Sequence, residues 1–403
     1  MLHLPRPRAA LHALLALPLA AAPAVAGRAP AAAAGPGGSG AARAAQASAT
    51  SSPARAATAY LRLRARCPLE PAAGRALAAR CLPGAPHAAR ERLLASGERR
   101  LATQLGHRTT GVSCRVVVRH VRLSADAATA TVAARVVTIV TWVAADGRTD
   151  TEGDGIDHTV VLVRRNGGWL VAADRYTSDL TPRLLQAAGA PQAVVDAAAG
   201  RLETAGVVTA PRVGPTTPAA AVPANATPTT PAGAAPGYVA QLSFDRTAAK
   251  AYADRCALSY NPTYASFSAD CANFGSQVMF AGGYPQFGDT YASGWWYDKH
   301  GTSSPADDTY SHAWIAVANQ QGAWHARYAD LVSSISDVGT GDFIAYDWTG
   351  NGTWDHVAEL VGTNSAGQKV VDAHTTDHYH VYWKLGTATT HYRFMHTRAT
   401  IVI

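Results

Sequence analysis

The pattern of apolar and polar positions changes its period along the chain. Between residues 57 and 105 apolar side chains recur at helical spacing, with Leu77, Leu94 and Leu101 on one face. Three prolines interrupt this stretch, namely Pro68, Pro71 and Pro83. Because proline ends or kinks a helix, the pattern predicts several short helices rather than one long helix.

After residue 112 the pattern is that of β-strands. Three stretches are rich in β-branched residues, which favour strands: 116–118, 129–143 and 159–163. Asn166-Gly167-Gly168 has the composition of a tight turn between two strands. Helices followed by an antiparallel meander predict a smaller α+β domain, which we place at residues 57–208.

A third pattern begins after a segment of low complexity. Residues 209–236 contain proline, threonine and alanine without apolar periodicity, which is typical of a semi-extended linker. A helix at about Asp245–Ser259 and a second one ending at Gly282-Gly283 follow. Short strands are then expected at residues 342–346, 356–361, 370–374 and 391–396. We therefore predict a second α+β domain at residues 237–403, and we expect it to fold on its own.

The beginning of the chain has the composition of an export signal. Residues 1–26 combine two arginines, an apolar stretch and the cleavage-site pattern Ala24-Val25-Ala26, although an alanine-rich disordered tail is the alternative. Residues 27–56 contain alanine, glycine, proline and serine with scattered arginine, and we expect them to be disordered. No other apolar run approaches the roughly 20 residues of a membrane span. The sequence therefore predicts a secreted protein, extracellular or cell-wall associated, without a membrane span.

The net charge of +7 hides an uneven distribution. Residues 1–110 contain 15 Arg, 3 Glu and neither Asp nor Lys, which gives +12. Residues 237–403 contain 9 Lys or Arg and 15 Asp or Glu, which gives −6. The basic region can attract anionic polymers, but it lacks the interleaved aromatic residues of a nucleic-acid surface. We therefore expect no nucleic-acid partner.

Five cysteines are an odd number for an exported chain. Cys67, Cys81, Cys114 and Cys256 can pair in three ways, and Cys67 with Cys81 is the first candidate because both lie in one segment. Cys271 then remains a free thiol. Catalysis is one reason to keep a free thiol in an oxidising compartment.

Cys271 lies where a loop gives way to a short apolar helix. Asp270 is the expected N-cap, so the thiol falls in the first helical turn, where free N–H groups favour a thiolate. A nucleophile needs a base, and His356 begins an apolar strand directly after a turn-rich loop. His374 ends the next strand, and an antiparallel hairpin would bring the two ends together. We therefore expect a lowered pKa for Cys271, although a small buried residue or half of a disulfide is the alternative.

Other residues are candidates for accessory roles. The backbone N–H of Cys271 and an upstream donor, Tyr260 or Tyr264, would form an oxyanion hole. Four tryptophans are candidates for a substrate groove and equally for the core: Trp295, Trp296, Trp314 and Trp354.

Two patterns raise the question of a metal. His374, His378 and His380, with His312 and His356, form a histidine-rich group, but no H-E-x-x-H or C-x-x-C spacing accompanies them. The loop from Asp347 to Asp355 has acidic and amide residues like a calcium loop, but it lacks the Glu at the bidentate position. A turn that positions His356 is the better interpretation. We therefore expect neither a metal nor a cofactor.

Four separated blocks of the C-terminal region resemble the bacterial "putative amidase" domain family. In order, they are DRTAAKAYADRCALSYNPTYASFSADCANFGSQVMFAGG, YSHAW, GDFIAYDWTGNGTWDHVAELVG and DAHTTD, within about residues 238–400. The family is typical of secreted Gram-positive proteins and is similar to papain-like enzymes, NlpC-like cell-wall peptidases and CHAP amidases. The resemblance implies Cys271 as nucleophile, His356 as base and His374 as the orienting residue. One departure is Ala272, where Thr or Ser is expected.

The resemblance and the residues together predict an activity. The C-terminal domain is expected to be a papain-like cysteine amidohydrolase that cleaves a peptide or cell-wall amide through a thioester. Asp372, Asp377 or a backbone carbonyl is an alternative to His374 as the orienting group. A non-catalytic module that binds the cell wall and a thiol acyltransferase are the alternative functions.

Overall fold

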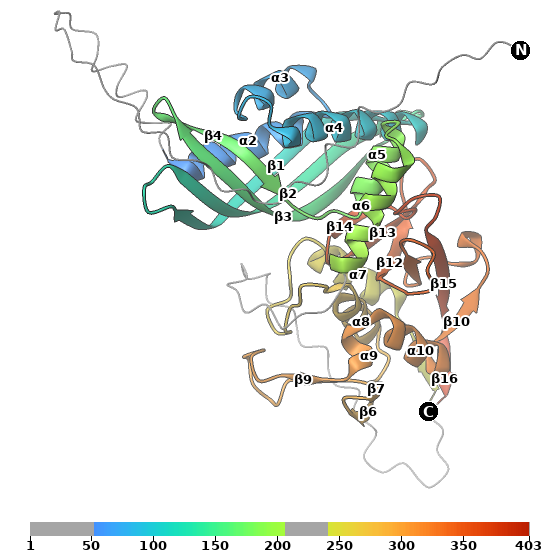
Figure 1. The fold of residues 1–403 in the computed structure, drawn as a ribbon. Coiled ribbons are helices and arrows are strands. Elements are labelled where there is room, and N and C mark those ends of the chain that lie inside the picture. Colours follow the sequence, from blue (N-terminus) through green and yellow to red (C-terminus); the bar gives the residue numbers. More distant parts are fainter. Residues whose placement is uncertain (1–51, 206–240, 403) are drawn as a thin grey trace, which may run out of the picture.

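The computed structural model describes residues 52–205 and 241–402 (Figure 1). The predicted signal peptide at 1–26, the predicted linker at 209–236 and most of the segment 27–56 lie outside these described residues. The end of that segment is helical, because helix α2 (Pro53–Arg66) begins within it. Ser52 caps the helix by accepting a hydrogen bond from the Arg55 N–H. The prediction of disorder is therefore wrong for the last residues of 27–56.

The N-terminal unit consists of helices laid over an antiparallel meander. The helices are α2, α3 (Pro71–Ala79) and α4 (Pro86–Gln104). The strands are β1 (His107–Leu123), β2 (Thr129–Ala144), β3 (Thr149–Arg165) and β4 (Gly168–Arg175), each paired with its neighbour in sequence. Along β2 every second residue from Ala130 to Val136 is buried, and this face packs against α2 and α3. Two further helices follow, α5 (Leu180–Ala187) and α6 (Gln192–Ala205).

The C-terminal unit is built on an antiparallel sheet. In spatial order its strands are β14 (Asp377–Tyr382), β13 (Lys369–Ala373), β12 (His356–Thr363), β11 (Phe343–Asp347), β15 (His391–Thr397) and β10 (Ala329–Val332). Its helices are α7 (Arg246–Cys256), α8 (Cys271–Ala281), α9 (His312–Ile315) and α10 (Val317–Arg327). Smaller elements complete it: β5 (Gln241–Ser243) with β16 (Thr400–Val402), β6 (Phe287–Thr290) with β7 (Ser293–Trp295), β8 (Tyr297–Asp298) with β9 (Thr309–Tyr310), and η1 (Ile335–Asp337). The α+β class predicted from the sequence is confirmed.

The sheet of the C-terminal unit separates two hydrophobic cores. Helices α7 to α10 cover one face, where Cys271 packs with Val357 and Phe343. The opposite face carries Tyr346, and Leu202 of α6 packs there. Because neighbouring residues of a strand point to opposite faces, a single step along β12 moves a side chain from one core to the other.

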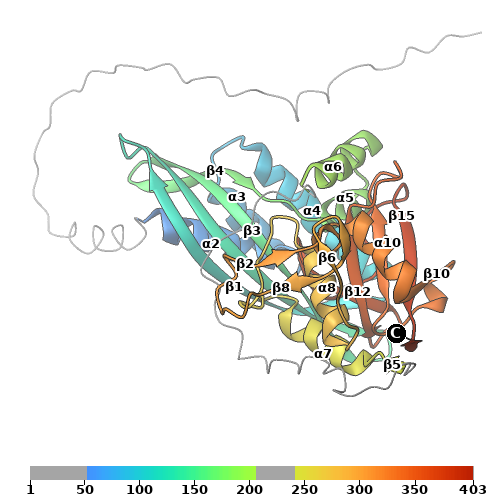
Figure 2. The same ribbon diagram turned by 90° about the horizontal axis from the view of Figure 1, so that it is seen from below.

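The two units share one sheet. Strands β3 and β14 pair in antiparallel register, with Asp154 opposite His378, so a ten-stranded sheet runs through both units. Figures 1 and 2 show β1, β2 and β3 extending from beneath the N-terminal helices toward the C-terminal unit. Gly155 lies at this junction, where a Cβ atom would overlap the Arg135 guanidinium. The Arg135 guanidinium also bonds Asp377 of β14 and so reinforces the pairing.

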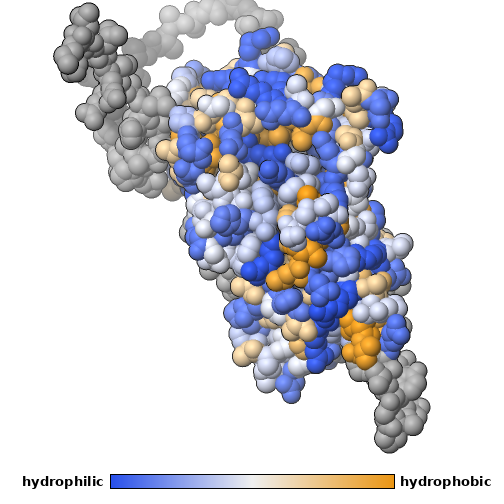
Figure 3. Space-filling model, turned by 90° about the vertical axis from the view of Figure 1, so that its right-hand side faces the viewer, coloured by the Kyte–Doolittle hydropathy of each residue, from blue (hydrophilic) through white to orange (hydrophobic). Residues whose placement is uncertain are grey.

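One face of the described surface is mainly polar (Figure 3). Figure 3 shows one face on which hydrophilic residues predominate and apolar residues form small, separate patches. Among the helices of the described ranges, none combines the length and the apolar composition that crossing a membrane requires.

Candidate active site

Cys271 is the first residue of α8 and lies at the interface between this helix and the sheet. Its side chain is nearly inaccessible, with 3% of the residue exposed. The turn between β13 and β14 meets it from the other side, because Thr375 Oγ1 accepts the backbone N–H of Asp270 at 2.9 Å and that of Cys271 at 3.2 Å. The helix start is therefore capped by a residue that adjoins His374.

The pKa of Cys271 is shifted in the opposite direction to the one expected from the sequence. Burial raises the pKa of the Cys271 thiol to about 11, although hydrogen bonds from the Val357 backbone and the Thr375 side chain partly oppose the shift. The expectation of a thiolate at neutral pH is therefore wrong for this conformation. Desolvation outweighs the helix terminus because the thiol does not face water.

His374 lies on the same face of the sheet as Cys271. Its Nδ1 is 2.7 Å from Asp270 Oδ2, and its Nε2 is 2.9 Å from the Cys256 carbonyl oxygen. The imidazole is held between two rings, with centroid distances of 4.1 Å to Phe274 and 4.2 Å to Tyr260. Both partners of the ring nitrogens are oxygen atoms, so the two contacts fix the orientation of the imidazole.

Asp270 is the group that orients His374. Its Oδ1 accepts hydrogen bonds from the Phe267 N–H at 2.8 Å and from Asn273 Nδ2 at 3.0 Å, while Oδ2 faces the imidazole. A carboxylate with this many donors is held in a single orientation. Asp270 is at the N-cap position, but its side chain makes no capping hydrogen bond to the helix; it fixes His374 instead, next to the turn residue Thr375 that bonds the Cys271 N–H.

His356 lies on the other face of the sheet. It pairs with Tyr346 across β11 and β12, and its ring packs against Tyr346 and Trp348 in the second core. Its Nε2 is 4.0 Å from Asp179 of the N-terminal unit. Burial lowers the pKa of His356 to about 4, although the nearby Asp179 carboxylate opposes this. The structure does not bring the His356 imidazole to Cys271, because Val357 occupies the position that faces the thiol.

Two further histidines of the group, His378 and His380, face different carboxylates, and His378 shares Asp179 with His356. His378 Nε2 is 2.6 Å from Asp179 Oδ1, and His380 Nε2 is 2.9 Å from Asp254 Oδ1. His374 faces Asp270 instead, so these three histidines share no ligand site. Strand alternation and the turn at Thr375 separate them, which a count of histidines along the sequence does not reveal.

The candidate oxyanion and groove residues have mostly structural contacts. The Tyr260 hydroxyl donates to Asp377 Oδ1 at 3.1 Å, and the Tyr264 ring packs against Trp314. Trp295 and Trp314 are fully buried, so for these two the core alternative holds rather than the groove. Trp296 and Trp354 are partly exposed.

The acidic loop before His356 is a turn. Asp347 accepts hydrogen bonds from the backbone N–H groups of Gly350, Asn351 and Gly352. Its two oxygens are thereby used within the loop, which supports the interpretation as a turn rather than a calcium loop. Asn351 also donates to Glu203 of α6 at 2.9 Å and so ties the loop to the N-terminal unit.

All five cysteines lie within the described ranges, and none forms a disulfide. The thiols of Cys67 and Cys81 instead donate to the carbonyls of Leu63 and Leu77, each at 3.2 Å. The pairing of Cys67 with Cys81 is therefore not formed in this structure.

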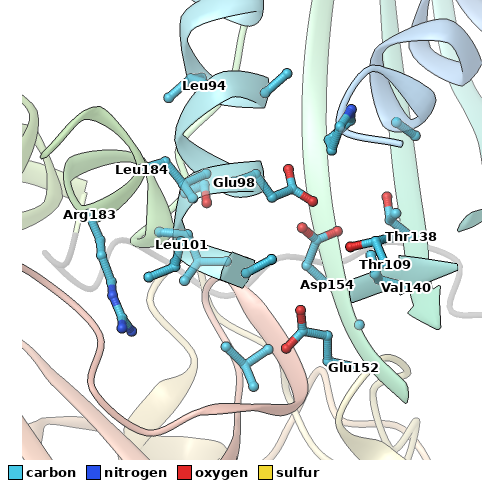
Figure 4. A pocket seen from close by; sticks show the side chains of 18 of the residues that line it. Leu94, Glu98, Leu101, Thr109, Thr138, Val140, Glu152, Asp154, Arg183 and Leu184 are labelled. Atoms are coloured by element: carbon cyan, nitrogen blue, oxygen red, sulfur yellow. The ribbon is translucent and has the colours of Figure 1, made fainter. Parts of the chain in front are cut away.

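A cavity in the N-terminal unit contains carboxyl groups that the sequence reasoning missed. It has a volume of about 140 Å³ and lies between α4, α5 and strands β2 and β3. Figure 4 shows the carboxyl groups of Glu98, Glu152 and Asp154 turned toward it. Burial and the neighbouring carboxylates raise the pKa of Glu98 to about 8 and that of Glu152 to about 7. The sequence contained one sign of this cavity, because Glu152 is an acidic residue within the long strand β3.

Comparisons with known proteins address the C-terminal unit. Residues 243–397 match the family described as "Putative amidase domain". The match supports the amidase resemblance over this region and suggests a hydrolase.

Particular relatives add little on function. The chain is similar to the uncharacterized protein YhbB of Bacillus subtilis (strain 168), with 30% identity over 163 residues, which are 38% of this chain and 50% of that protein. This chain therefore spans about half the length of that curated relative. A crystal structure of the intermembrane space region of the chloroplast protein ARC6 matches at 15% identity and TM-score 0.22, covering 30% of this chain and 90% of that one. A TM-score this low carries no argument about the fold.

Proposed function

We propose that the C-terminal unit is a papain-like cysteine amidohydrolase in which Cys271 is the nucleophile, His374 the base and Asp270 the orienting carboxylate. One observation carries the proposal: residues 270–271 and 374–375 interlock through the His374–Asp270 contact and the two hydrogen bonds to Thr375. A cysteine at a helix start beside a histidine oriented by a carboxylate is the arrangement that thiol hydrolases require.

The reaction follows from these roles. Cys271 Sγ attacks the amide carbonyl, and a C–S bond forms as the C–N bond breaks. The thiol proton passes to His374 and from there to the leaving amine. Water then adds to the thioester, which releases the acid and restores the thiol. The conformation described here is closed, so substrate has to open the contact between α8 and the turn at Thr375 and free one nitrogen of His374.

A cell-wall peptide is the proposed substrate, and the outside of the cell the proposed location. The export-type composition of residues 1–26 and the amidase-family match support both. The burial and raised pKa of Cys271 favour a second candidate, a non-catalytic module that binds the cell wall.

Release of amines from purified cell-wall peptides tests the proposal. Cys271→Ala and His374→Ala should abolish release. Cys114→Ala, a control thiol in the N-terminal meander, should retain it. His356→Ala should retain activity wherever circular dichroism shows a folded protein.

Three results would overturn parts of the proposal. Activity in Cys271→Ala would exclude the nucleophile. Loss in folded His356→Ala, with activity retained in His374→Ala, would return the base to His356. Binding of the peptides without any release, in wild type as in Cys271→Ala, would favour the non-catalytic module.

A further inference from the structure

A cluster of metal-ligating side chains lies beneath α7, on the same face of the sheet as Cys271. It brings together Asp254 of α7, Asp372 of β13 and His380 of β14, and one potential ligand atom from each lies within 4.8 Å of the others. Three different elements therefore supply ligands to one point.

A third carboxyl group, that of Glu359, lies next to this cluster and has no hydrogen-bond partner among the described residues. Glu359 of β12 is directly opposite Asp372 in the strand register and is only 1% exposed. Within the described part of the chain, neither oxygen of Glu359 has a hydrogen-bond partner, and the same holds for Asp372 Oδ2. A buried carboxyl group without partners is costly, and a cation is the partner that would satisfy several such oxygens together.

A single lysine, Lys250, cannot neutralise the three carboxyl groups of Asp254, Asp372 and Glu359. Lys250 pairs with Asp254 across one helical turn, and its side chain is 34% exposed. His380 donates its backbone N–H to Asp372 Oδ1 at 2.6 Å, so the strand turns this residue toward the acids. Three carboxyl groups thus face one ammonium group, which sits at the solvent side and can swing away.

We propose that Asp254, Asp372, Glu359 and His380 bind a divalent transition-metal cation. Carboxylate oxygens with one imidazole nitrogen suit Zn²⁺ or Mn²⁺ better than Ca²⁺, which takes oxygen ligands. The cation takes the place of the hydrogen bond between His380 and Asp254 and displaces Lys250 toward solvent.

The site joins the helix to the sheet next to the candidate catalytic residues. Asp254 is two residues before Cys256, whose carbonyl contacts His374, and Asp372 is two residues before His374 itself. A bound cation therefore fixes α7 on β12, β13 and β14. It stabilises the fold whether or not Cys271 is catalytic, so the site can be tested without an activity assay.

Binding of Zn²⁺ and Mn²⁺ to the full-length, untagged, chelator-treated protein tests the proposal by calorimetry and thermal melting. Wild type should bind one equivalent and melt at a higher temperature with metal. Asp372→Asn and Glu359→Gln should each weaken binding about tenfold or more. Asp330→Asn is the matched control, because this acid pairs with Arg398 at the opposite edge of the sheet and should bind metal as wild type does.

Lys250→Met separates a metal site from acids that are merely protonated. Removal of the competing ammonium group should tighten metal binding. The absence of a saturable site in wild type, or equal affinity in wild type, Glu359→Gln and Lys250→Met, would overturn the proposal. Stronger binding of Ca²⁺ than of Zn²⁺ and Mn²⁺ would overturn the assigned metal class. If Asp372→Asn fails to fold, the comparison of wild type with Glu359→Gln and Lys250→Met decides.

Discussion

Acidification should destabilise the protein through His356. The His356 residue is 2% exposed, and its imidazole packs against Tyr346 and Trp348. The imidazole Nε2 lies 4.0 Å from Asp179 across the junction between the units. Burial lowers the pKa of His356 from 6.5 to about 4. The unfolded chain therefore binds a proton between these pH values that the folded chain does not bind.

The sign and size of the stability change follow from the shift in the pKa of His356. Because the folded pKa lies below the unfolded pKa, the stability contributed by neutral His356 is present above pH 6.5 and is lost as the pH falls toward 4. Each pH unit of displacement corresponds to about 1.4 kcal/mol, so the loss is about 3 kcal/mol. This is a large part of the stability of a typical domain.

Denaturant unfolding at pH 7 and pH 4 measures the effect. The loss of unfolding free energy between these pH values should be about 3 kcal/mol larger in wild type than in His356→Gln, which has no proton to bind. His391→Gln is the control, because this histidine is 67% exposed on its side chain and should leave the pH dependence unchanged. Equal pH dependence in wild type and His356→Gln would refute the assigned burial of a neutral imidazole.

Three further predictions follow from the cavity, the thiol and the junction. Glu98→Gln should raise the melting temperature at pH 8 and much less at pH 5, because a raised folded pKa costs stability as pH rises from the ordinary value of 4.5 to about 8; an equal change at both pH values would contradict this. Alkylation of Cys271 by iodoacetamide should remain slow below pH 8 and accelerate toward pH 11, measured by mass spectrometry; fast alkylation at pH 6 would indicate a thiolate. The fragment 237–403 should unfold at a lower temperature than the full chain, roughly 2–4 °C for each kcal/mol lost, because it leaves the β14 edge unpaired and uncovers the core that Leu202 packs against. Equal melting temperatures would show that the shared sheet contributes no stability.

The sequence by itself determined the local elements and the nucleophile candidate. Richness in β-branched residues located β2, and an apolar run after a turn-rich loop located β12. Helical spacing located the helices before residue 105, and the switch from loop to apolar helix placed Cys271 at the start of α8. These features depend on residues near one another along the chain. The α+β class follows from their order, and the amidase-family match covers the same C-terminal region.

Tertiary structure decided which side chains meet. His356 and Val357 are neighbours in sequence, yet the pleat of β12 turns them to opposite cores, and only Val357 faces Cys271. Asp270 contacts His374 because the turn after β13 folds back on the start of α8. Glu359 lies near enough to Asp254 to be affected by its charge because α7 packs against β12. Pairing of β3 with β14 likewise joins residues more than 200 positions apart. Such contacts depend on register and packing between distant elements, and local periodicity carries no information about either.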